Sequence, residues 1–401
     1  MIHPLLSTMV SMNADPNSSE SSEKADSDFE AFLERSTTLP DVTITLIEFA
    51  SEELANQLAG ILRAHLSIFG RILDLSGLAQ VYVSYDYRST LATLERGFET
   101  NRTLSPTEDE VAVGIAMAPA VVREGKVKSV IVLSAPHFAS LLPSQEAPEN
   151  GSKLDQLRDL VVHTLGHECG HVHDRELQAR CFPEVLLKQS WSPAQDALVG
   201  TAFACWEEYI ASRLSAPWGN EHTAPGFEDA FCSRLENAWS IMVRSIRLYR
   251  MHGDVPRVLA EVASQIRMVA MYGSYLVGHL AGLDQALETA APNASALLKA
   301  NQPFERFMKR LEKECDSLYS THGSWADTKV FDTLTEAVHD LYKEVGLTFR
   351  ETENGTCLDI PHRADTMPTL TEFGEFQQQQ IRKHIADAVN GTETTNPVAK
   401  P

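Results

Sequence analysis

The sequence predicts an α+β fold, in which a small mixed β-sheet in the N-terminal half precedes a long helix and a largely α-helical C-terminal half. Short runs with strand-like alternation or β-branched residues are confined to the chain before residue 135. An uninterrupted helical pattern then covers residues 154–176, and helical patterns fill the chain after Ser192. The predicted order is therefore sheet, long helix and helical half.

The N-terminal elements follow from hydrophobic periodicity. Strands are expected at residues 42–46 (extendable to Phe49), 80–87, 111–122 and 127–134, and helices at residues 52–72 and 90–98. The last two strands flank Arg123-Glu124-Gly125-Lys126. This spacing predicts a β-hairpin with its turn at the glycine.

The C-terminal half is predicted to be helical throughout. Ser192 is a good N-cap, with Pro193 at the first helical position, for a helix that runs to Ala216, where Pro217 and Gly219 end it. Further helical patterns cover residues 225–250, 256–290, 294–315 and 326–346.

The chain is expected to divide into four parts. Residues 1–30 are rich in Ser, Asp and Glu and predict a disordered leader, and residues 392–401 predict a flexible tail. Between them, residues 41–175 form an α/β subdomain that ends with the long helix, and residues 192–390 form an α-helical subdomain.

The composition predicts a large folded protein that binds neither nucleic acid nor a membrane. Hydrophobic residues make up 43% of the 401 residues, enough for the core of one or two domains. The net charge of −21 argues against nucleic acid or an anionic membrane surface as the main partner. No apolar run reaches the roughly 18–20 residues that a membrane span needs. Residues 1–12 lack the basic region of a signal peptide and the six cysteines lack CxxC pairs, so we expect reduced thiols and a cytoplasmic location. The oligomeric state is not indicated.

The most informative motif is His167-Glu168-Cys169-Gly170-His171, inside the predicted helix Leu154–Glu176 that Ser152 could cap. Side chains four apart lie on one face of a helix, so His167 and His171 can bind one metal ion together. Glu168 is rotated by about 100° from His167, close enough to hold a water without being a ligand. The neighbouring residues are uncharged, which predicts that this turn is buried. His163 lies one turn earlier and is expected to line the cleft or to be a core residue, since three ligands from one helix would be poorly placed.

A third ligand is expected from the helix that follows Ser192. Glu207 and Glu208 lie there within an apolar stretch, and two adjacent carboxylates are costly to bury without a cation. A zinc ion would supply that cation, giving a site with two histidines, one glutamate and an open position for water. Helical phasing places Glu207 on the apolar stripe of Phe203 and Ile210. It does not settle which glutamate binds.

These residues resemble the gluzincin class of HExxH metallopeptidases. Glu208-Tyr-Ile-Ala211-Ser212-Arg213 is similar to the Glu-x-x-Ala-Asp element that supplies the third ligand in several of those families, and the resemblance covers Leu154–Leu214. It implies that His167, His171 and Glu208 bind Zn²⁺. Two positions depart from the pattern: Ser212 replaces an aspartate, so the partner of a ligand imidazole could be missing or supplied by Asp174, and His173 replaces a hydrophobic residue.

The resemblance also implies that the sheet packs on the HExxH helix and that its edge strand borders the cleft. Such an edge could bind an extended peptide by strand addition, with residues 111–122 or 127–134 as the candidate strand.

A Tyr or His from the helical half often helps to stabilise the oxyanion in related enzymes. Tyr272, Tyr275 and His279 share one face of the predicted helix 256–290. Tyr275 and His279 are therefore catalytic candidates, although polar aromatic residues on a packed face are commonly core residues. Gly273 and Gly278 would allow another helix to approach closely.

The predicted function is hydrolysis of peptide bonds in a peptide or protein substrate by a zinc-activated water, with Glu168 as the general base. Two alternatives stay open. One is a catalytically inactive, metal-stabilised binding or regulatory protein, which would have no need of Glu168. The other is a zinc hydrolase of a non-peptide amide.

Overall fold

The structure is a computed structural model that describes residues 31–32, 34–100, 104–106, 114–143, 153–182, 191–353 and 355–392. The chain forms two compact units, Met1–Ser233 with Ala270–Val338 and Arg234–Val269 with His339–Pro401. The sheet, the HExxH helix and the helix that carries Glu208 all belong to the first unit. The predicted leader (residues 1–30), the cap Ser152 and all of the predicted tail except Thr392 lie outside the described residues.

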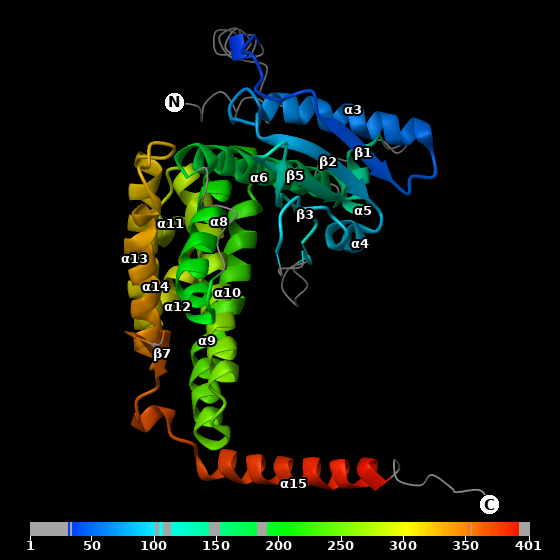
Figure 1. Cartoon of the computed structure of the whole chain (residues 1–401). Helices are drawn as coiled ribbons and strands as arrows, with labels where there is room; N and C mark the ends of the chain where they lie inside the picture. Colours follow the sequence, from blue (N-terminus) through cyan, green and yellow to red (C-terminus); the bar gives the residue numbers. More distant parts are fainter. Residues whose placement is uncertain are drawn as a thin grey trace, which may run out of the picture. The chain divides into compact units, whose positions relative to one another are not determined.

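A mixed five-stranded sheet organises the N-terminal part of the first unit (Figure 1). Its strands are β1 (Thr43–Ile47), β2 (Leu78–Ser84), β3 (Ala116–Met117), β4 (Ala120–Arg123) and β5 (Lys126–Ser134). Strands β1, β2 and β5 are parallel, whereas β3 and β4 pair antiparallel with β5. Strand β3 forms the edge of the order β1-β2-β5-β3. The predicted mixed sheet is confirmed.

The predicted hairpin is also confirmed, because β4 and β5 meet with Arg123 opposite Lys126. Glu124 and Gly125 between them have φ of 51° and 73°. This backbone matches the type I′ turn, whose two central residues both need positive φ. The predicted strand 111–122 is divided into β3 and β4 by residues 118–119, and its first three residues are not described.

Helices cover the two faces of the sheet. Helix α3 (Glu52–Phe69) and the long helix α6 (Lys153–Cys181) share one buried cluster with β2 and β5, formed by Leu58, Leu62, Leu66, Val81, Val83, Ile131, Leu133, Val161, Leu165, Cys169 and Val172. On the other face, α4 (Tyr87–Ala92) contributes Tyr87 and Leu91, which pack on Val130 and Val132 (Figure 1). The sheet therefore packs on the HExxH helix, as predicted.

Two N-terminal helix boundaries differ from the prediction. Helix α4 begins before residue 90 because the Asp86 side chain accepts the Ser89 amide N–H at 3.0 Å and caps it. Helix α3 ends before residue 72, at Gly70, where a Cβ atom would lie 2.4 Å from Thr37 Oγ1. A short helix α5 (Ala135–Phe138) and a 3₁₀ turn η1 (Ala139–Leu141) follow β5.

The second ligand helix begins as predicted at Ser192, whose side chain forms a capping box with Gln195. Its course is a first turn α7 (Pro193–Gln195), a π-helical turn η2 (Asp196–Gly200), α8 (Thr201–Ser215) and a final 3₁₀ turn η3 (Ala216–Trp218).

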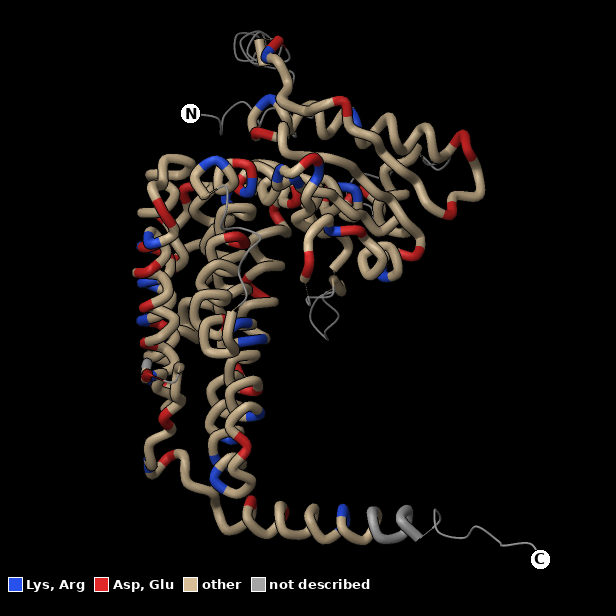
Figure 2. The backbone as a smooth tube through the Cα atoms, in the orientation of Figure 1, with Lys and Arg blue, Asp and Glu red and all other residues tan. Residues whose placement is uncertain are grey.

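The remaining helices are α9 (Thr223–His252), α10 (Val255–Gly282), α11 (Leu287–Ala290), α12 (Pro292–Ala300), α13 (Gln302–Ser320), η4 (Thr328–Phe331), α14 (Asp332–Val345) and α15 (Leu370–Thr392). The predicted helix 256–290 is interrupted between α10 and α11, where Asp284 has φ of 54°. The predicted helix 294–315 is interrupted at Asn301, which is followed by Gln302-Pro303. Charged residues of both signs alternate along α13 (Figure 2). Glu305 and Lys309 form an ion pair of 2.7 Å there, while Phe304 and Leu311 are buried.

The prediction that the C-terminal half is helical throughout is wrong. Strands β6 (Thr348–Thr352) and β7 (Gly355–Asp359) form an antiparallel hairpin in the second unit. Phe349 is buried there, and Gly355 adopts φ of 113° at the turn. In the part of the chain that the structure describes, no helix has the length and apolar character to cross a membrane. A small 3₁₀ turn, η5 (Ala364–Thr366), precedes α15.

Candidate metal centre

Helices α6 and α8 pack against each other in antiparallel directions. Gly170 of α6 meets Ala211 of α8, and one turn further along α6, Asp174 meets Trp206, which lies earlier in α8. A Cβ atom on Gly170 would lie 2.9 Å from Ala211 Cα and 3.2 Å from its carbonyl oxygen. The glycine therefore permits a close helix contact directly beside the motif.

This contact brings His167, His171 and Glu208 together as a group that could hold a metal ion. Glu208 Oε2 lies 3.2 Å from His167 Nε2 and 3.4 Å from His171 Nε2, and the two Nε2 atoms are 3.1 Å apart. In a tetrahedral site with zinc–ligand distances of about 2.0–2.1 Å, the ligand atoms lie about 3.3–3.4 Å from one another. The three atoms therefore have close to the spacing that one zinc ion requires. The histidine side chains are each 12% exposed and that of Glu208 is 16% exposed, so the cluster is shielded but reachable.

Glu207 lies outside this group, although helical phasing favoured it. It is rotated by about 100° from Glu208, and burial raises the pKa of its carboxyl, with the charge of Arg175 acting in the opposite direction. Arg213 of the same helix forms an ion pair of 2.5 Å with Asp316. The structure thus places Glu208, and not Glu207, beside the two imidazoles.

The charges of the cluster suit a cation. Burial would lower the pKa of His171, but the Glu208 carboxylate outweighs this effect and raises it to about 9. Burial would raise the pKa of Glu208, but the two imidazoles hold it well below its usual range. Glu208 therefore keeps a negative charge at this buried position. A divalent cation in place of the imidazole proton would preserve this charge pairing.

Glu168 is 6% exposed and adjoins the ligand cluster. Burial raises the pKa of its carboxyl, and the neighbouring His171 and His167 act in the opposite direction. A carboxyl whose pKa is raised by burial suits general-base chemistry.

Tyr275 and His279, the two candidates on α10, have different surroundings. The Tyr275 ring lies 5.6 Å from the His167 ring. Burial, together with the nearby Glu208 carboxylate, raises the pKa of its hydroxyl. Phe227 stacks on the Tyr275 ring at 5.8 Å with an interplanar angle of 4°. His279 is only 1% exposed, and its Nδ1 has no hydrogen-bond partner among the described residues. Burial lowers the pKa of His279 to about 4, so its imidazole is neutral at pH 7.

His163 lies outside the ligand group. It is buried, its Nε2 is 3.5 Å from Ser215 Oγ, and its ring contacts His279 at 5.6 Å. The close helix approach predicted at the α10 glycines is confirmed, because a Cβ on Gly278 would lie 2.3 Å from the Tyr209 carbonyl oxygen of α8.

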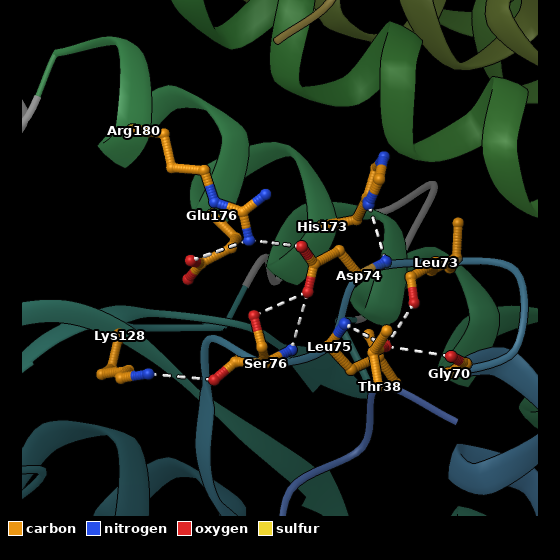
Figure 3. A network of polar contacts seen from close by, with 10 residues as sticks. All are labelled: Thr38, Gly70, Leu73, Asp74, Leu75, Ser76, Lys128, His173, Glu176 and Arg180. Carbon is orange, nitrogen blue, oxygen red and sulfur yellow. Dashed lines mark hydrogen bonds and ion pairs between the residues drawn. The ribbon is translucent and has the colours of Figure 1, made fainter. Parts of the chain in front are cut away.

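His173 anchors α6 to the loop between α3 and β2 (Figure 3). Its Nδ1 accepts the Asp74 backbone N–H at 2.8 Å. The Asp74 carboxylate also accepts bonds from Ser76 Oγ at 2.6 Å and from Arg180 at 2.5 Å. A histidine is accommodated at this usually hydrophobic position because the loop offers it a backbone donor.

Asp174 does not contact a ligand imidazole. Because Ser212 replaces an aspartate, the sequence left two possibilities: that this partner is missing, or that Asp174 supplies it. The second possibility is wrong. Its Oδ1 accepts bonds from Trp206 Nε1 at 3.1 Å and His322 Nε2 at 2.9 Å, and its Oδ2 accepts one from Gln178 at 2.6 Å. Ser212 is fully buried and its Oγ has no partner among the described residues. Sequence reasoning missed the contribution of His322, which lies far from the motif and has no local pattern. The one sequence feature that pointed to this hydrogen-bond network was the position of Asp174, one turn after His171.

Arg175 links α6 to the edge of the sheet. Its guanidinium donates to the Ala118 carbonyl oxygen and to Ser129 Oγ, both at 2.7 Å. Ala118 directly follows the edge strand β3. Across the residues that are described, β3 pairs with β5 alone and forms an edge of the sheet.

Comparison with known proteins adds no family to this description. No protein-family model matches the chain, and neither the curated proteins nor the solved structures yield a match. The functional argument therefore rests on the geometry of the His167, His171 and Glu208 cluster and on the short resemblance between residues 154 and 214.

Proposed function

We propose that this chain is a zinc-dependent metallopeptidase of the gluzincin type, in which His167, His171 and Glu208 hold the ion and Glu168 is the general base. One observation carries the proposal: the three ligand atoms, drawn from two helices, lie 3.1–3.4 Å apart. This spacing suits two imidazoles and a carboxylate around a single zinc ion. A structural zinc site would normally be closed by a fourth protein ligand, and among the described residues the group has three members.

Zinc, when bound there, would polarise the scissile carbonyl and lower the pKa of a water towards 7. Glu168 takes the proton from the attacking water and passes it to the leaving amine. Its burial next to the ligand pair supports this role, because a carboxylate there is poorly solvated and accepts a proton readily. A purely structural metal site would have no use for this group.

Tyr275 is the better placed of the two candidates for stabilising the oxyanion. Its ring lies 5.6 Å from that of His167 and its hydroxyl is near the Glu208 carboxylate, so the hydroxyl could donate to a substrate oxygen at the metal. His279 is enclosed by His163 and Phe227, at ring distances of 5.6 and 5.3 Å. It therefore supports the helix packing behind the site.

A peptide substrate is favoured over other amides by the edge strand. Strand β3 lies at the edge of the sheet, and Arg175 fixes the following residue, Ala118, to the ligand helix. A peptide that pairs with this edge would extend the sheet by one strand beside α6. This arrangement recognises backbone groups and so accommodates many side chains.

The test is the Glu168→Gln variant, which keeps the size of the side chain but removes the base. We expect zinc content to equal that of the wild type, while cleavage of a peptide library, read by mass spectrometry, falls by about 10²–10⁴-fold. Glu176→Gln, two turns further along α6, is the matched control and should leave cleavage unchanged. Equal turnover in wild type and Glu168→Gln would refute the mechanism. A zinc-loaded wild type that cleaves no peptide would favour a binding protein or a hydrolase of another amide.

A further inference from the structure

We propose that Asp174 is a positioning residue for the metal group: through its bond to Trp206 it holds the helix that carries Glu208 in register with the helix that carries the two histidines. This inference rests on the proposed function, since it concerns the same metal group. It assigns a role to a buried carboxylate that neither binds the ion nor contacts its ligands.

The network around Asp174 is buried. Its side chain is 3% exposed and that of His322 is 7% exposed. One oxygen accepts Trp206 Nε1 and His322 Nε2, at 3.1 and 2.9 Å. A carboxylate only accepts hydrogen bonds, so Nε2 of His322 carries the hydrogen. Buried networks of this kind are costly to break and fix side chains in one arrangement.

The position of the network explains what it controls. Asp174 lies one turn after His171 on α6, and Trp206 lies two residues before Glu208 on α8. The helices also meet where Gly170, next to His171, contacts Ala211, three residues after Glu208. A slide or rotation of α8 that moved Glu208 away from the histidines would therefore also stretch the bond between Trp206 and Asp174.

His322 brings a third element to the same oxygen. It belongs to the turn at residues 321–323 that follows α13. Gly323 in this turn adopts φ of 78°, and a Cβ there would lie 3.2 Å from Leu177 of α6. Trp325 packs on Trp206 with ring centroids 5.4 Å apart. The turn thus closes over the Trp206–Asp174 bond and keeps water away from it.

The same helix offers a matched control. Arg180 and Asp74 anchor α6 to the loop before β2 through a bond of 2.5 Å (Figure 3), and among the described residues no hydrogen bond or ion pair joins them to α8. Loss of this anchor should affect the stability of the fold without changing the register between the two ligand helices.

The experiment compares Asp174→Ala, Trp206→Phe and His322→Gln with Arg180→Ala in the full chain. Zinc affinity is measured by chelator competition, coordination by the visible spectrum of the Co²⁺-substituted protein, and stability by unfolding of the zinc-free protein. We expect zinc affinity to fall about 10-fold or more in Asp174→Ala and Trp206→Phe, because ligand distances at a metal site tolerate only about 0.2 Å of displacement. The cobalt spectrum should change as well. His322→Gln retains a donor and should show a smaller loss, and Arg180→Ala should bind zinc like the wild type.

Asp174→Asn serves as the conservative variant, because its carbonyl oxygen can still accept the Trp206 and His322 bonds. It should recover most of the zinc affinity and the wild-type cobalt spectrum. Unchanged zinc affinity in Asp174→Ala and Trp206→Phe, despite lower stability, would overturn the positioning role and leave the proposed function standing. An equal loss in Arg180→Ala would also overturn it, since stability alone would then explain the effect. A wild type that binds no zinc would overturn both proposals.

Discussion

Replacing Gly170 by alanine tests whether the close contact between α6 and α8 sets the metal geometry. The added Cβ would lie 2.9 Å from Ala211 Cα, 3.2 Å from its carbonyl oxygen and 3.3 Å from its Cβ, whereas ordinary contacts begin at 3.4 Å. Two of these atoms belong to the backbone and the third, Cβ, is bonded directly to it. No flexible side chain can therefore move aside. The helices must separate locally by about 0.5–1 Å, which is the kind of overpacking that costs about 1–3 kcal/mol.

The free energy of unfolding alone reports this change poorly. Alanine also gains about 1 kcal/mol of helix propensity over glycine, which offsets part of the clash. Zinc affinity is more sensitive, because ligand distances at a metal site tolerate only about 0.2 Å. We therefore expect Gly170→Ala to lose at least about 10-fold in zinc affinity, equivalent to about 1.4 kcal/mol, while its free energy of unfolding falls by no more than about 2 kcal/mol.

The assay is chelator competition for zinc, with urea unfolding of the zinc-free protein in parallel. Gly60→Ala in α3 is the control, because a Cβ there meets no atom within 4 Å. It should stabilise the protein by about 0.5–1 kcal/mol and leave zinc binding unchanged. Wild-type zinc affinity in Gly170→Ala would show that the helix contact does not set the ligand geometry, and the reasoning would fail.

Three further outcomes follow from the site. Glu208→Gln should lose zinc to a mild chelator far faster than Glu207→Gln, since only Glu208 lies beside the imidazoles; equal loss rates would contradict this assignment. Tyr275→Phe should keep zinc but lower kcat about 10²-fold, as expected when one oxyanion donor is removed; an unchanged kcat would remove Tyr275 from the mechanism. Chelation of the metal should lower the Tm by about 5 °C, because a ligand at 1,000 times its Kd stabilises the fold by about 4 kcal/mol and a chain of this length unfolds with an entropy of about 0.8 kcal/mol/K; an unchanged Tm in calorimetry would argue against a bound ion.

Local signals made much of the fold predictable. The Ser192-Pro193 start of the second ligand helix, the Glu124-Gly125 turn of the hairpin and the uninterrupted α6 each depend on residues adjacent in sequence. Their conformations follow from caps, positive φ and helical periodicity, which tertiary contacts here did not override.

Features that depend on contacts between distant segments were harder to predict. Phasing along α8 favoured Glu207, but the Gly170–Ala211 contact decides which side of that helix faces the histidines. His322 reaches Asp174 across 148 positions of sequence, so no local pattern marks it. The hairpin β6–β7 was missed because its strands contain no valine or isoleucine and so lack the β-branched apolar pattern that marked β1.

The most direct test of the account is a crystal structure of the zinc-loaded protein, with anomalous diffraction measured at the zinc absorption edge. A single strong peak is predicted about 2.0–2.2 Å from His167 Nε2, His171 Nε2 and a Glu208 carboxylate oxygen. Loss of that peak is expected in the double variant His167→Ala/His171→Ala. A peak coordinated by Glu207 with Glu208 turned away, or zinc bound elsewhere while this cluster stays free of metal, would contradict the central claim.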